Sequence, residues 1–568
     1  MRPDSYALGL DYGTNSVRAV VVDCATGQLC GESVFNYPSG AKGVIIDPAR
    51  PHLARQHPGD YITGFVRAAK QAVRNAASAR GFSPDRIVGI GVDTTGSTPI
   101  PIAADGTPVG MLDEYRDDPD AQAWLWKDHT SHAEAAEITE LAESRGEPYL
   151  AKCGGVYSSD WFWSKILRCR RVAPKVFRKA ASWVELADFV PAWVTGNREP
   201  SAIVRGICAA GHKAMFSPAW GGLPSESFLA ALHPDLAKLR SRLYSRAVPS
   251  NEPAGRLTSE FAKKIGVPTG IPVAAGAFDA HHGAVGSGVA PGTLVKIIGT
   301  STCDIAVWPS DEPLADIPGL CGIVDGSVLP GYFGLEAGQS AVGDIFNWVA
   351  SLGGGKAKHG ALTDTAETLT PGEAGLLTLD WHNGNRTVLV NPRLSGLTVG
   401  QTLHTTQAEL YRSAIEGTAF GARVIVERME AYGVSIRTIT HCGGIAEKSG
   451  LVNQIYADVL GRKVRISGSP QTCALGAAIF GSIVGGAHKS VKAAQRSMVS
   501  FKDEVYTPRR AERSVYDELF ALYGILHDAM GGVGGSLAEQ TGRVMPELLA
   551  IQERARAKKA RAAKGKPS

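Results

Sequence analysis

Two stretches in opposite halves of this 568-residue chain follow one plan, and this repetition restricts the folds open to the chain. The first, LGLDYGTNSVRAVVVD from Leu8 to Asp23, predicts a strand, a Gly-Thr-Asn turn and a second strand, with a third strand after it. The second, TLVKIIGTSTCDIAVW from Thr293 to Trp308, repeats the strand, a Gly-Thr-Ser turn and a strand. We therefore predict duplicated α/β domains that face each other across a cleft, with a boundary near residues 286 to 292.

The segments that follow each hairpin support this division. Apolar residues between Asp60 and Arg80 recur at helical spacing, and the strand IVGIGVDTT comes next, from Ile87 to Thr95. In the second half, a helical stretch from Thr405 to Tyr432 precedes the strand TITHCGG and an Ala- and Gly-rich helix, CALGAAIFGSIVGG. We assign residues 5–285 to an N-terminal domain, 286–510 to a C-terminal domain, and 511–568 to a peripheral helix and a basic, disordered tail.

Charge and composition give no indication of a polymeric or membrane partner. The formal net charge is +4, and much of it lies in the tail ERARAKKARAAKGKPS, from Glu553 onward. A nearly neutral body gives no general case for binding nucleic acid or an anionic membrane. The nine cysteines include no CxxC pair, no apolar run reaches the ~20 residues that span a bilayer, and the N-terminus lacks the apolar core of a signal peptide. We expect a cytoplasmic protein with reduced thiols.

The first hairpin carries residues suited to a phosphate group. Its turn, at Gly13, Thr14 and Asn15, can aim backbone N–H groups at phosphate oxygens. Asp11 at the strand end can hold Mg²⁺ through water, and Arg18 belongs to the same group of residues. Because Gly-Thr-Asn is also a good structural turn, this pattern alone leaves both interpretations open.

The second hairpin offers the same kind of anion cradle, at Gly299, Thr300 and Ser301. Two such loops, one from each half, can hold the phosphates of a nucleotide from both sides. The strand that ends at Gly443 and Gly444 lets backbone approach a flat ligand closely, which would suit adenosine. Each glycine pair can equally form the turn at the start of a helix.

Asp279 lies between an apolar strand and a helix start in VAAGAFDAHHGAVGSG. Between two anion cradles, a carboxylate can accept a hydroxyl proton during phosphoryl transfer. The structural alternative is a helix N-cap. The adjacent His281 and His282 point in different directions and lack partners at metal-ligand spacing, so we expect them to serve packing or helix-start polarity.

Recognition of a polyol needs hydrogen-bonding groups set against an aromatic face. The motifs LWKDHT, AGHK and GLEAGQS could supply them. Their candidate residues are Trp126, Lys127, Asp128, Lys213, Glu336 and Gln339. For LWKDHT, the alternative is a solvated helix start.

At these residues the chain resembles the FGGY carbohydrate kinases, whose two actin-like ATPase (ribonuclease H-like) α/β domains face each other across a catalytic cleft. The similarity runs from about Leu8 to about Thr507. Its most specific stretches are GIGVDTTGSTPIPI, LWKDHT, GGVYSSDWFWSKIL, AGAFDAHHGAVGSG, VKIIGTSTCDI, GLEAGQSAVGDIFNW and CALGAAIF. The resemblance implies ATP and Mg²⁺ as cofactors and phosphorylation of L-ribulose to L-ribulose 5-phosphate in arabinose breakdown. D-ribulose, ribitol and xylulose are the alternative substrates.

The same resemblance implies roles for individual residues. Asp11 and the turn from Gly13 to Asn15 look like the first phosphate and metal site, Gly299 to Ser301 like the second phosphate site, and Gly443 with Gly444 like the adenosine site. Lys213, Asp279 and Glu336 look like sugar contacts, with Asp279 as the catalytic base, and Gly96 and Ser97 lie on the loop that borders the sugar. Ser449 stands where the family often has an asparagine, and AGAFD replaces its usual GGAFD.

The actin-like fold also serves sugar-binding repressors and ATPase chaperones. A repressor would need a helix-turn-helix ahead of the first hairpin, where only seven residues precede Leu8. A chaperone would need a peptide-binding domain after the ATPase core, and the region after Arg510 is short and polar. We therefore expect a kinase whose partners are a small sugar and ATP, with no nucleic acid and no membrane; the sequence is compatible with a homodimer.

Overall fold

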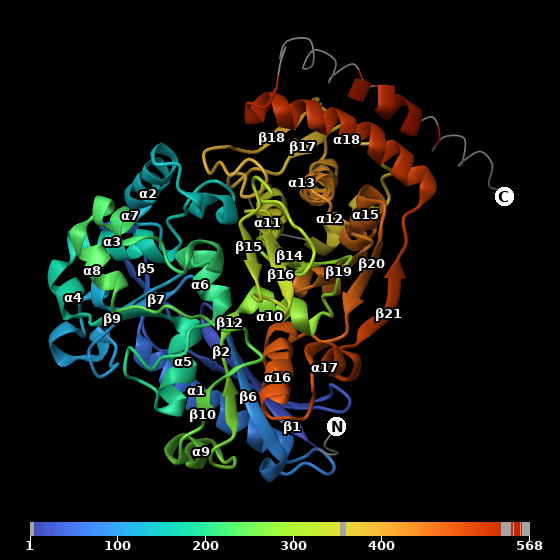
Figure 1. The fold of residues 1–568 in the computed structure, drawn as a ribbon. Helices are drawn as coiled ribbons and strands as arrows, with labels where there is room; N and C mark the ends of the chain where they lie inside the picture. Colours follow the sequence, from blue (N-terminus) through green and yellow to red (C-terminus); the bar gives the residue numbers. More distant parts are fainter. Residues whose placement is uncertain (1–4, 353–358, 535–546, 549, 557, 559–568) are drawn as a thin grey trace.

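The computed structural model describes residues 5–352, 359–534, 547, 548, 550–556 and 558. Two large mixed sheets form the centres of two α/β lobes, and a smaller, mainly helical region lies beside the first lobe (Figure 1). The first sheet contains β1 (Tyr6–Tyr12), β2 (Ser16–Asp23), β3 (Leu29–Asn36), β6 (Ile87–Thr94), β10 (Pro253–Arg256), β11 (Pro272–Ala274) and β12 (Ala277–Phe278). The second contains β13 (Thr293–Ile298), β14 (Thr302–Pro309), β15 (Gly322–Asp325), β16 (Tyr332–Ala337), β19 (Thr438–Cys442), β20 (Lys463–Ser467) and β21 (Phe501–Tyr506).

The two sheets repeat one topology. The first runs β3-β2-β1-β6-β11 and the second β16-β14-β13-β19-β20. In each order, the first three strands are antiparallel neighbours, the fourth strand pairs in parallel with the strand that opens the hairpin, and the fifth pairs in parallel with the fourth. The predicted duplication is confirmed, as are the α/β class and the two hairpins that open the halves.

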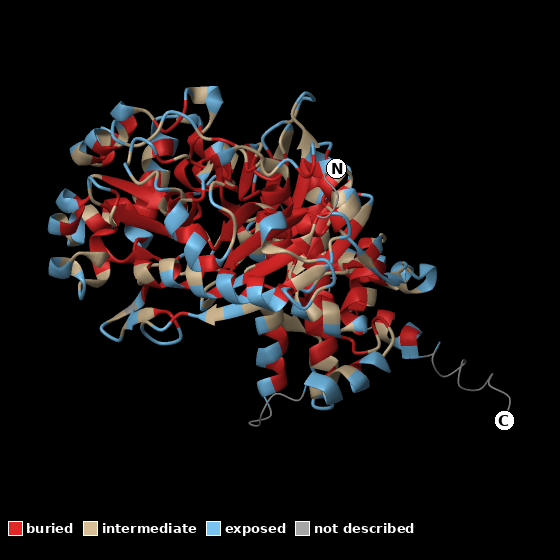
Figure 2. Cartoon of the chain, turned by 90° about the horizontal axis from the view of Figure 1, so that it is seen from below, coloured by how far each residue is buried: buried red, intermediate tan, exposed pale blue. Residues whose placement is uncertain are grey.

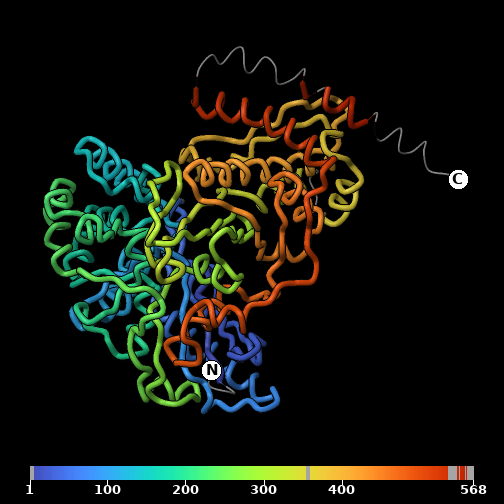
Figure 3. The backbone as a smooth tube through the Cα atoms, turned by 45° about the vertical axis from the view of Figure 1, so that its right-hand side comes forward, coloured from blue at the N-terminus to red at the C-terminus, as the bar shows by residue number. Residues whose placement is uncertain are grey.

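Helices cover both faces of the first sheet. Leu8 and Leu10 of β1 face α1 (Pro58–Ala76), which is the amphipathic helix predicted after the first meander. The intervening residue Gly9 faces α16 (Thr472–Val484). This helix belongs to the second half of the sequence, yet it lies beside the N-terminal strands (Figures 1 and 3).

Glycines in the strands allow α16 to approach the sheet closely. A Cβ atom at Gly91 of β6 would lie 1.8 Å from the carbonyl oxygen of Ala477, and one at Gly9 would lie 1.9 Å from that of Ala474. The backbone of α16 thus occupies the space that side chains take elsewhere. α16 belongs to the second half of the chain but covers the sheet of the first lobe, so each lobe is not built from one continuous stretch of sequence. The division into domains of residues 5–285 and 286–510 therefore stays a proposal.

The second lobe packs its sheet against α13 (Gln407–Ala431), α15 (Gly450–Leu460) and α18 (Arg510–Gly531). Thr406 and Glu409 form a reciprocal capping box at the start of α13, which places the helix expected from Thr405 to Tyr432. Buried residues fill the interiors of both lobes (Figure 2). Among the described residues, no helix is long and apolar enough to cross a bilayer.

The expected disorder of the tail from Glu553 is wrong for residues 553–556, which are helical. They continue the described helical residues 547, 548 and 550–552, and Leu548, Ile551 and Ala555 are all buried against the second lobe. Arg554 pairs with Glu518 of α18. The sequence analysis missed that the three apolar residues recur at helical spacing across the start of the basic segment; residues 559–568 lie outside the described part.

The close contact between α16 and β6 predicts that Gly91→Ala lowers the thermal stability of the protein. The added methyl group would meet backbone atoms, which cannot rotate away, and overpacking of this kind costs about 1–3 kcal/mol. Differential scanning calorimetry should therefore show a lower Tm. Gly360→Ala in α12 (His359–Glu367) is the matched control, because a Cβ there meets nothing within 4 Å and a helical alanine is favoured. Equal Tm values for both variants would contradict the packing described here.

Candidate active site

Three acidic side chains meet at one edge of the first sheet. β1, β6 and β12 are parallel neighbours, and their register places Asp11 beside Asp93 and Phe278 beside Thr94. Asp279 follows directly after β12, and the Asp11 and Asp93 carboxyl groups are in contact. This is the carboxyl end of the strands, where open α/β sheets bind their ligands. The structure thus brings the predicted Asp11 and Asp279 together, and it adds Asp93.

The position and the pKa of Asp279 suit a proton acceptor. Burial and the nearby Asp11 raise its pKa to about 7, against the opposing effects of the Ala280 N–H and Lys213. The Ala280 N–H donates to the Asp279 carboxylate at 2.7 Å. Asp279 is the first residue of α10 (Asp279–Gly286), and the N-cap position belongs to Phe278, so the N-cap alternative does not hold. A carboxyl group that titrates near neutral pH suits general-base chemistry.

The first turn, Gly13 to Asn15, is held from three sides. The Gln56 amide donates to the Thr14 carbonyl oxygen at 2.8 Å, and the Trp126 indole N–H donates to the Thr14 hydroxyl at 3.0 Å. The Asn15 amide donates to the Lys42 carbonyl oxygen at 2.6 Å. Trp126 therefore contacts the first turn, and the predicted contact of its ring with a sugar stays a prediction.

Arg18 of β2 lies at the mouth of the same turn. Its guanidinium group is 3.6 Å from the Asp11 carboxylate and is almost half exposed. Burial raises the pKa of Asp11, whereas Arg18 and the contact with Asp93 lower it by less. Arg18 therefore offers a positive charge beside the three acidic groups.

The second turn and the glycine pair occupy the matching edge of the second sheet. β13 ends at the exposed turn from Gly299 to Ser301, and its parallel neighbour β19 ends at Gly443. Gly443 has a φ of +93°, and a Cβ atom there would lie 2.6 Å from the Ile298 carbonyl oxygen. Gly444 borders open space. The structure thus groups these predicted nucleotide residues at one edge.

Two charged residues join the lobes between these edges. Lys213 of α6 (Ile207–Ala214) lies 3.3 Å from the Glu336 carboxylate of β16, and Arg386 donates to Glu336 at 2.8 Å. Burial would raise the pKa of Glu336, but Lys213, His212 and Arg386 outweigh it and hold the carboxyl group ionised. Lys213 also lies near the rings of Trp161 and Phe278. Charged groups beside aromatic rings are what binding a polyol requires.

The loop at Gly96 and Ser97 is held rigidly next to Asp279. A Cβ atom at Gly96 would lie 1.8 Å from the Phe278 ring, so the loop packs directly on the residue before Asp279. Ser97 is wholly buried; its hydroxyl donates to Glu185, and its carbonyl oxygen accepts from Lys165 at 2.9 Å. The Ser97 hydroxyl is therefore engaged by Glu185, and a contact between the Gly96–Ser97 loop and a substrate stays a prediction.

Lys165 and Glu185 were not singled out from the sequence. Lys165 of α3 (Phe162–Val172) is buried and also donates to the Leu125 carbonyl oxygen at 2.8 Å, so it ties the Ser97 loop to the LWKDHT segment. Burial lowers its pKa to about 8 despite nearby carboxylates. A lysine within the aromatic run DWFWSKIL was the available signal, since a charge in an apolar helix face needs partners.

Two further sequence predictions are corrected by burial. Asp128 is fully buried, pairs with Arg55 and accepts from the Ala54 N–H at 2.7 Å, so it holds the loop and has no free oxygen for a sugar. Its neighbour Lys127 is half-buried. Gln339 is buried behind the second turn, where its amide oxygen accepts from Lys296 at 2.7 Å.

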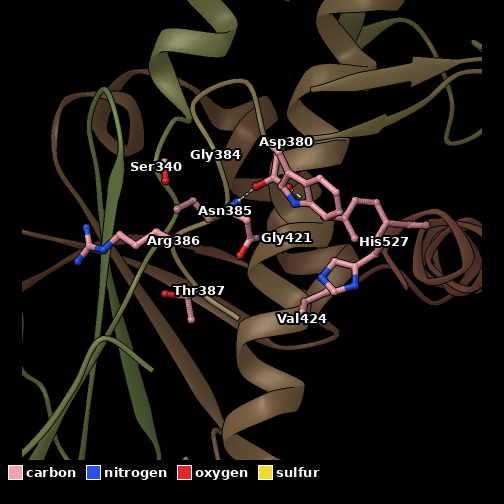
Figure 4. A pocket seen from close by; sticks show the side chains of 12 residues that line it. Ser340, Asp380, Gly384, Asn385, Arg386, Thr387, Gly421, Val424 and His527 are labelled. Carbon is pink, nitrogen blue, oxygen red and sulfur yellow. Dashed lines mark hydrogen bonds between the residues drawn. The ribbon is translucent and has the colours of Figure 1, made fainter. Parts of the chain in front are cut away.

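The Gln339 amide nitrogen donates to Asp380 at 2.7 Å, and Asp380 in turn accepts from Tyr523 of α18. Lys296 binds Asp304 and the Thr302 hydroxyl next to the turn. This buried polar network stabilises the second turn from inside the second lobe. Figure 4 shows Asp380 next to α18, while Arg386 points away from it.

Ser449 caps α15, because its hydroxyl accepts from the Val452 N–H at 3.3 Å. The residue therefore has a structural role that the comparison with a family asparagine did not indicate. A direct contact with a nucleotide base stays a prediction.

Comparisons with known proteins agree with this geometry. The N-terminal domain model of the FGGY family of carbohydrate kinases matches residues 6–286, and its C-terminal domain model matches residues 294–484. The chain is similar to the ribulokinase of Vibrio parahaemolyticus, with 40% identity over 91% of this chain and 94% of that protein. It is also similar to the ribulokinase of Halalkalibacterium halodurans, with 38% identity over 93% and 95%.

Solved structures show the same fold. The xylulose kinase from Rhodospirillum rubrum superposes with a TM-score of 0.77 at 24% identity, over 93% of this chain and 99% of that one. Plasmodium falciparum glycerol kinase with ADP gives a TM-score of 0.74 at 15% identity, over 91% and 97%. Both similarities concern the fold, including its two lobes and mixed sheets.

The structural role of Asp128 predicts that Asp128→Asn lowers the free energy of unfolding by about 3 kcal/mol. Breaking a buried ion pair costs about 3–5 kcal/mol, and Arg55 keeps Asp120 as a second partner at 3.2 Å, which favours the lower end. Urea unfolding followed by circular dichroism measures the change. Lys127→Met on the next residue is the control and should leave the unfolding free energy unchanged. A stable Asp128→Asn protein with selectively weakened sugar binding would restore Asp128 to the binding site.

Proposed function

Because the chain belongs to the FGGY family of carbohydrate kinases, we propose that it transfers the γ-phosphoryl group of MgATP to a hydroxyl group of L-ribulose, forming L-ribulose 5-phosphate. The chain is a sugar kinase that uses ATP and phosphorylates ribulose. The L configuration of the sugar, the magnesium ion and the roles of individual residues are the parts that we propose. One observation supports the magnesium ion and the residue roles: each large sheet ends in a glycine turn, and Asp279 at the edge of the first sheet has a pKa raised to about 7. The L configuration rests on the resemblance carried by the motifs VDTTGSTPIPI and LWKDHT.

In this proposal Asp279 accepts the proton of the sugar hydroxyl as the oxygen attacks the γ-phosphorus. The bond from that phosphorus to the β,γ-bridging oxygen breaks, and ADP leaves with the bonding electrons. Lys213 and Glu336 hold other sugar hydroxyls as donor and acceptor, and Phe278 and Trp161 provide the apolar wall. Gly96 keeps the neighbouring loop close to Asp279 without occupying the space of the substrate.

The nucleotide lies along the edges of the two sheets. The turns from Gly13 to Asn15 and from Gly299 to Ser301 donate backbone N–H groups to the phosphates. Gly443 and Gly444 allow the adenosine to approach β19 without side-chain clashes. Closing the lobes around both substrates would exclude water, which would otherwise accept the phosphoryl group.

The acidic edge of the first sheet fits a magnesium ion. Mg²⁺ prefers oxygen ligands and is commonly held by one or two carboxylates together with substrate phosphates. Asp11 lies at the mouth of this edge, and both carboxylate oxygens of the buried Asp93 lack a hydrogen-bond partner within the described structure. When bound, the ion neutralises the charge of the phosphates during transfer. Asp11 would hold it there.

The proposal is tested by a coupled assay of ADP release over pentuloses, pentoses and pentitols with MgATP. The kcat/KM for L-ribulose should exceed that for D-ribulose, ribitol and xylulose. A higher value for ribitol or xylulose would overturn the substrate assignment while leaving the kinase class intact. No sugar-dependent release of ADP would overturn the class itself.

Asp279→Asn should lower kcat by about 10² to 10⁴-fold, with a much smaller change in sugar affinity, because Asn keeps an acceptor oxygen but cannot take the proton. In the unsubstituted enzyme, the base works only when it is deprotonated. The kcat/KM should therefore fall as the pH drops through about 7. Steady-state kinetics across pH 5 to 9 should show this acidic limb and its loss in the variant. Near-normal turnover of Asp279→Asn would remove the base assignment.

Asp11→Asn should cut turnover strongly and raise the Mg²⁺ concentration needed for half-maximal activity, because one charge facing the ion is lost. The measurement is a Mg²⁺ titration of the initial rate at saturating sugar, with circular dichroism to check the fold. Unaltered metal dependence together with normal turnover would place Asp11 outside the metal site.

A further inference from the structure

Asp93 is a buried acidic residue near the site, and its carboxylate lacks hydrogen-bond donors among the described residues. Its side chain is completely buried in β6, and among the described residues it contacts Asp11 but neither of its carboxylate oxygens accepts a hydrogen bond. Buried polar groups in native proteins are almost always paired, and an isolated buried carboxylate is expensive. A group of this kind calls for a partner that the protein atoms alone do not provide.

The groups that face Asp93 do not balance its charge. Asp11 from β1 contacts it, and Asp279 from α10 adds a further negative charge. The thiol of Cys473 at the start of α16 lies close to the same three carboxyl groups. The Nδ1 atom of His282 lies 3.7 Å from the Asp93 carboxylate.

His282 does not hydrogen-bond to Asp93 in the described structure. It is fully buried, its ring stacks on Phe480 at a centroid distance of 4.8 Å, and its Nε2 already lies 3.3 Å from the Ser250 hydroxyl. In the described parts of the chain, no lysine or arginine forms an ion pair with Asp93; Arg18 reaches Asp11 from the exposed side. A cation that comes with a ligand would balance this negative charge.

We propose that Asp93 is a second carboxylate of the magnesium site, facing with Asp11 the ion that accompanies the nucleotide. Asp11 and Asp93 occupy paired positions on adjacent parallel strands, which lie about 4.8 Å apart. That spacing suits two carboxylates that share one hydrated ion, because Mg²⁺ retains several of its waters and binds them to nearby acids. This inference rests on the proposed use of MgATP.

The competing role for Asp93 is that of a neutral carboxylic acid that donates a hydrogen bond to Asp11. The two roles differ in their response to Asp93→Asn. An asparagine amide can still donate to Asp11, so it would replace the neutral acid with little effect. It cannot replace a negative charge that faces a cation.

The test is isothermal titration calorimetry of ADP with and without Mg²⁺, which needs no turnover. For each variant, the ratio of the ADP affinities with Mg²⁺ and with EDTA measures how strongly the protein couples nucleotide and metal. In Asp93→Asn this ratio should fall at least about tenfold, whereas the metal-free affinity should hold or rise, because a negative charge near the phosphates is gone.

Two further variants serve as a positive and a negative control for this measurement. Asp11→Asn should lower the ratio in the same direction. Asp188→Asn is the matched control, a buried aspartate of the same lobe whose carboxylate accepts from the Gly206 N–H at 2.8 Å, and it should leave the ratio unchanged. If Asp93→Asn does not fold, Asp93→Ser serves as the second variant.

A ratio for Asp93→Asn equal to that of the unsubstituted protein would overturn the inference, and so would equal losses of affinity with and without Mg²⁺, which would indicate a structural role. If only Asp11→Asn lowers the ratio, the magnesium site stands and Asp93 is excluded from it. If the unsubstituted protein shows no gain in ADP affinity from Mg²⁺, the magnesium part of the proposed function fails as well.

Discussion

The contact of α16 with the strands of the first sheet and with α10 is the constraint on which the site depends. These elements touch through backbone rather than side chains: a Cβ atom at Gly476 of α16 would lie 1.8 Å from the His282 carbonyl oxygen, and one at Gly286 would lie 2.1 Å from that of Thr472. α16 comes from the second half of the sequence and α10 begins with Asp279. Their close packing therefore fixes Asp279 relative to Asp11 and Asp93 and joins the two lobes.

Charge decides what this geometry can do. At the edge of the first sheet, three carboxylates gather with the half-exposed Arg18 beside Asp11; burial and the nearby Asp11 raise the pKa of Asp279, and the excess of negative charge favours a cation. Between the lobes, Lys213 and Arg386 keep Glu336 ionised. One region thus has an excess of negative charge, and in the other the Glu336 carboxylate is already paired with Lys213 and Arg386.

The sequence predicted the parts of this account that depend on local pattern. The strand and turn signals around Gly13 and Gly299 gave both hairpins and the duplicated topology, and the acid before a helix start gave Asp279. It could not show which polar side chains are already engaged. Asp128 and Gln339 look like ligands in a motif, yet their partners Arg55 and Asp380 come from distant segments, and only the tertiary structure reveals them.

Asp93 was missed for the opposite reason. It lies within the apolar strand IVGIGVDTT, where a carboxylate is costly unless it serves a ligand. That signal was present in the sequence, but its meaning depends on the pairing of β6 with β1, which no local pattern reveals. The apolar residues of the tail were overlooked similarly, because their docking surface belongs to α18 and the second lobe.

The most direct test of the central claim is a crystal structure with L-ribulose and a non-hydrolysable MgATP analogue bound together. The account predicts that the phosphates touch both turns, near Gly13 and near Gly299, and that one sugar hydroxyl lies within hydrogen-bonding distance of Asp279 and in line with the γ-phosphorus. A nucleotide that contacts only one lobe, or a sugar whose hydroxyls lie away from Asp279, would contradict it.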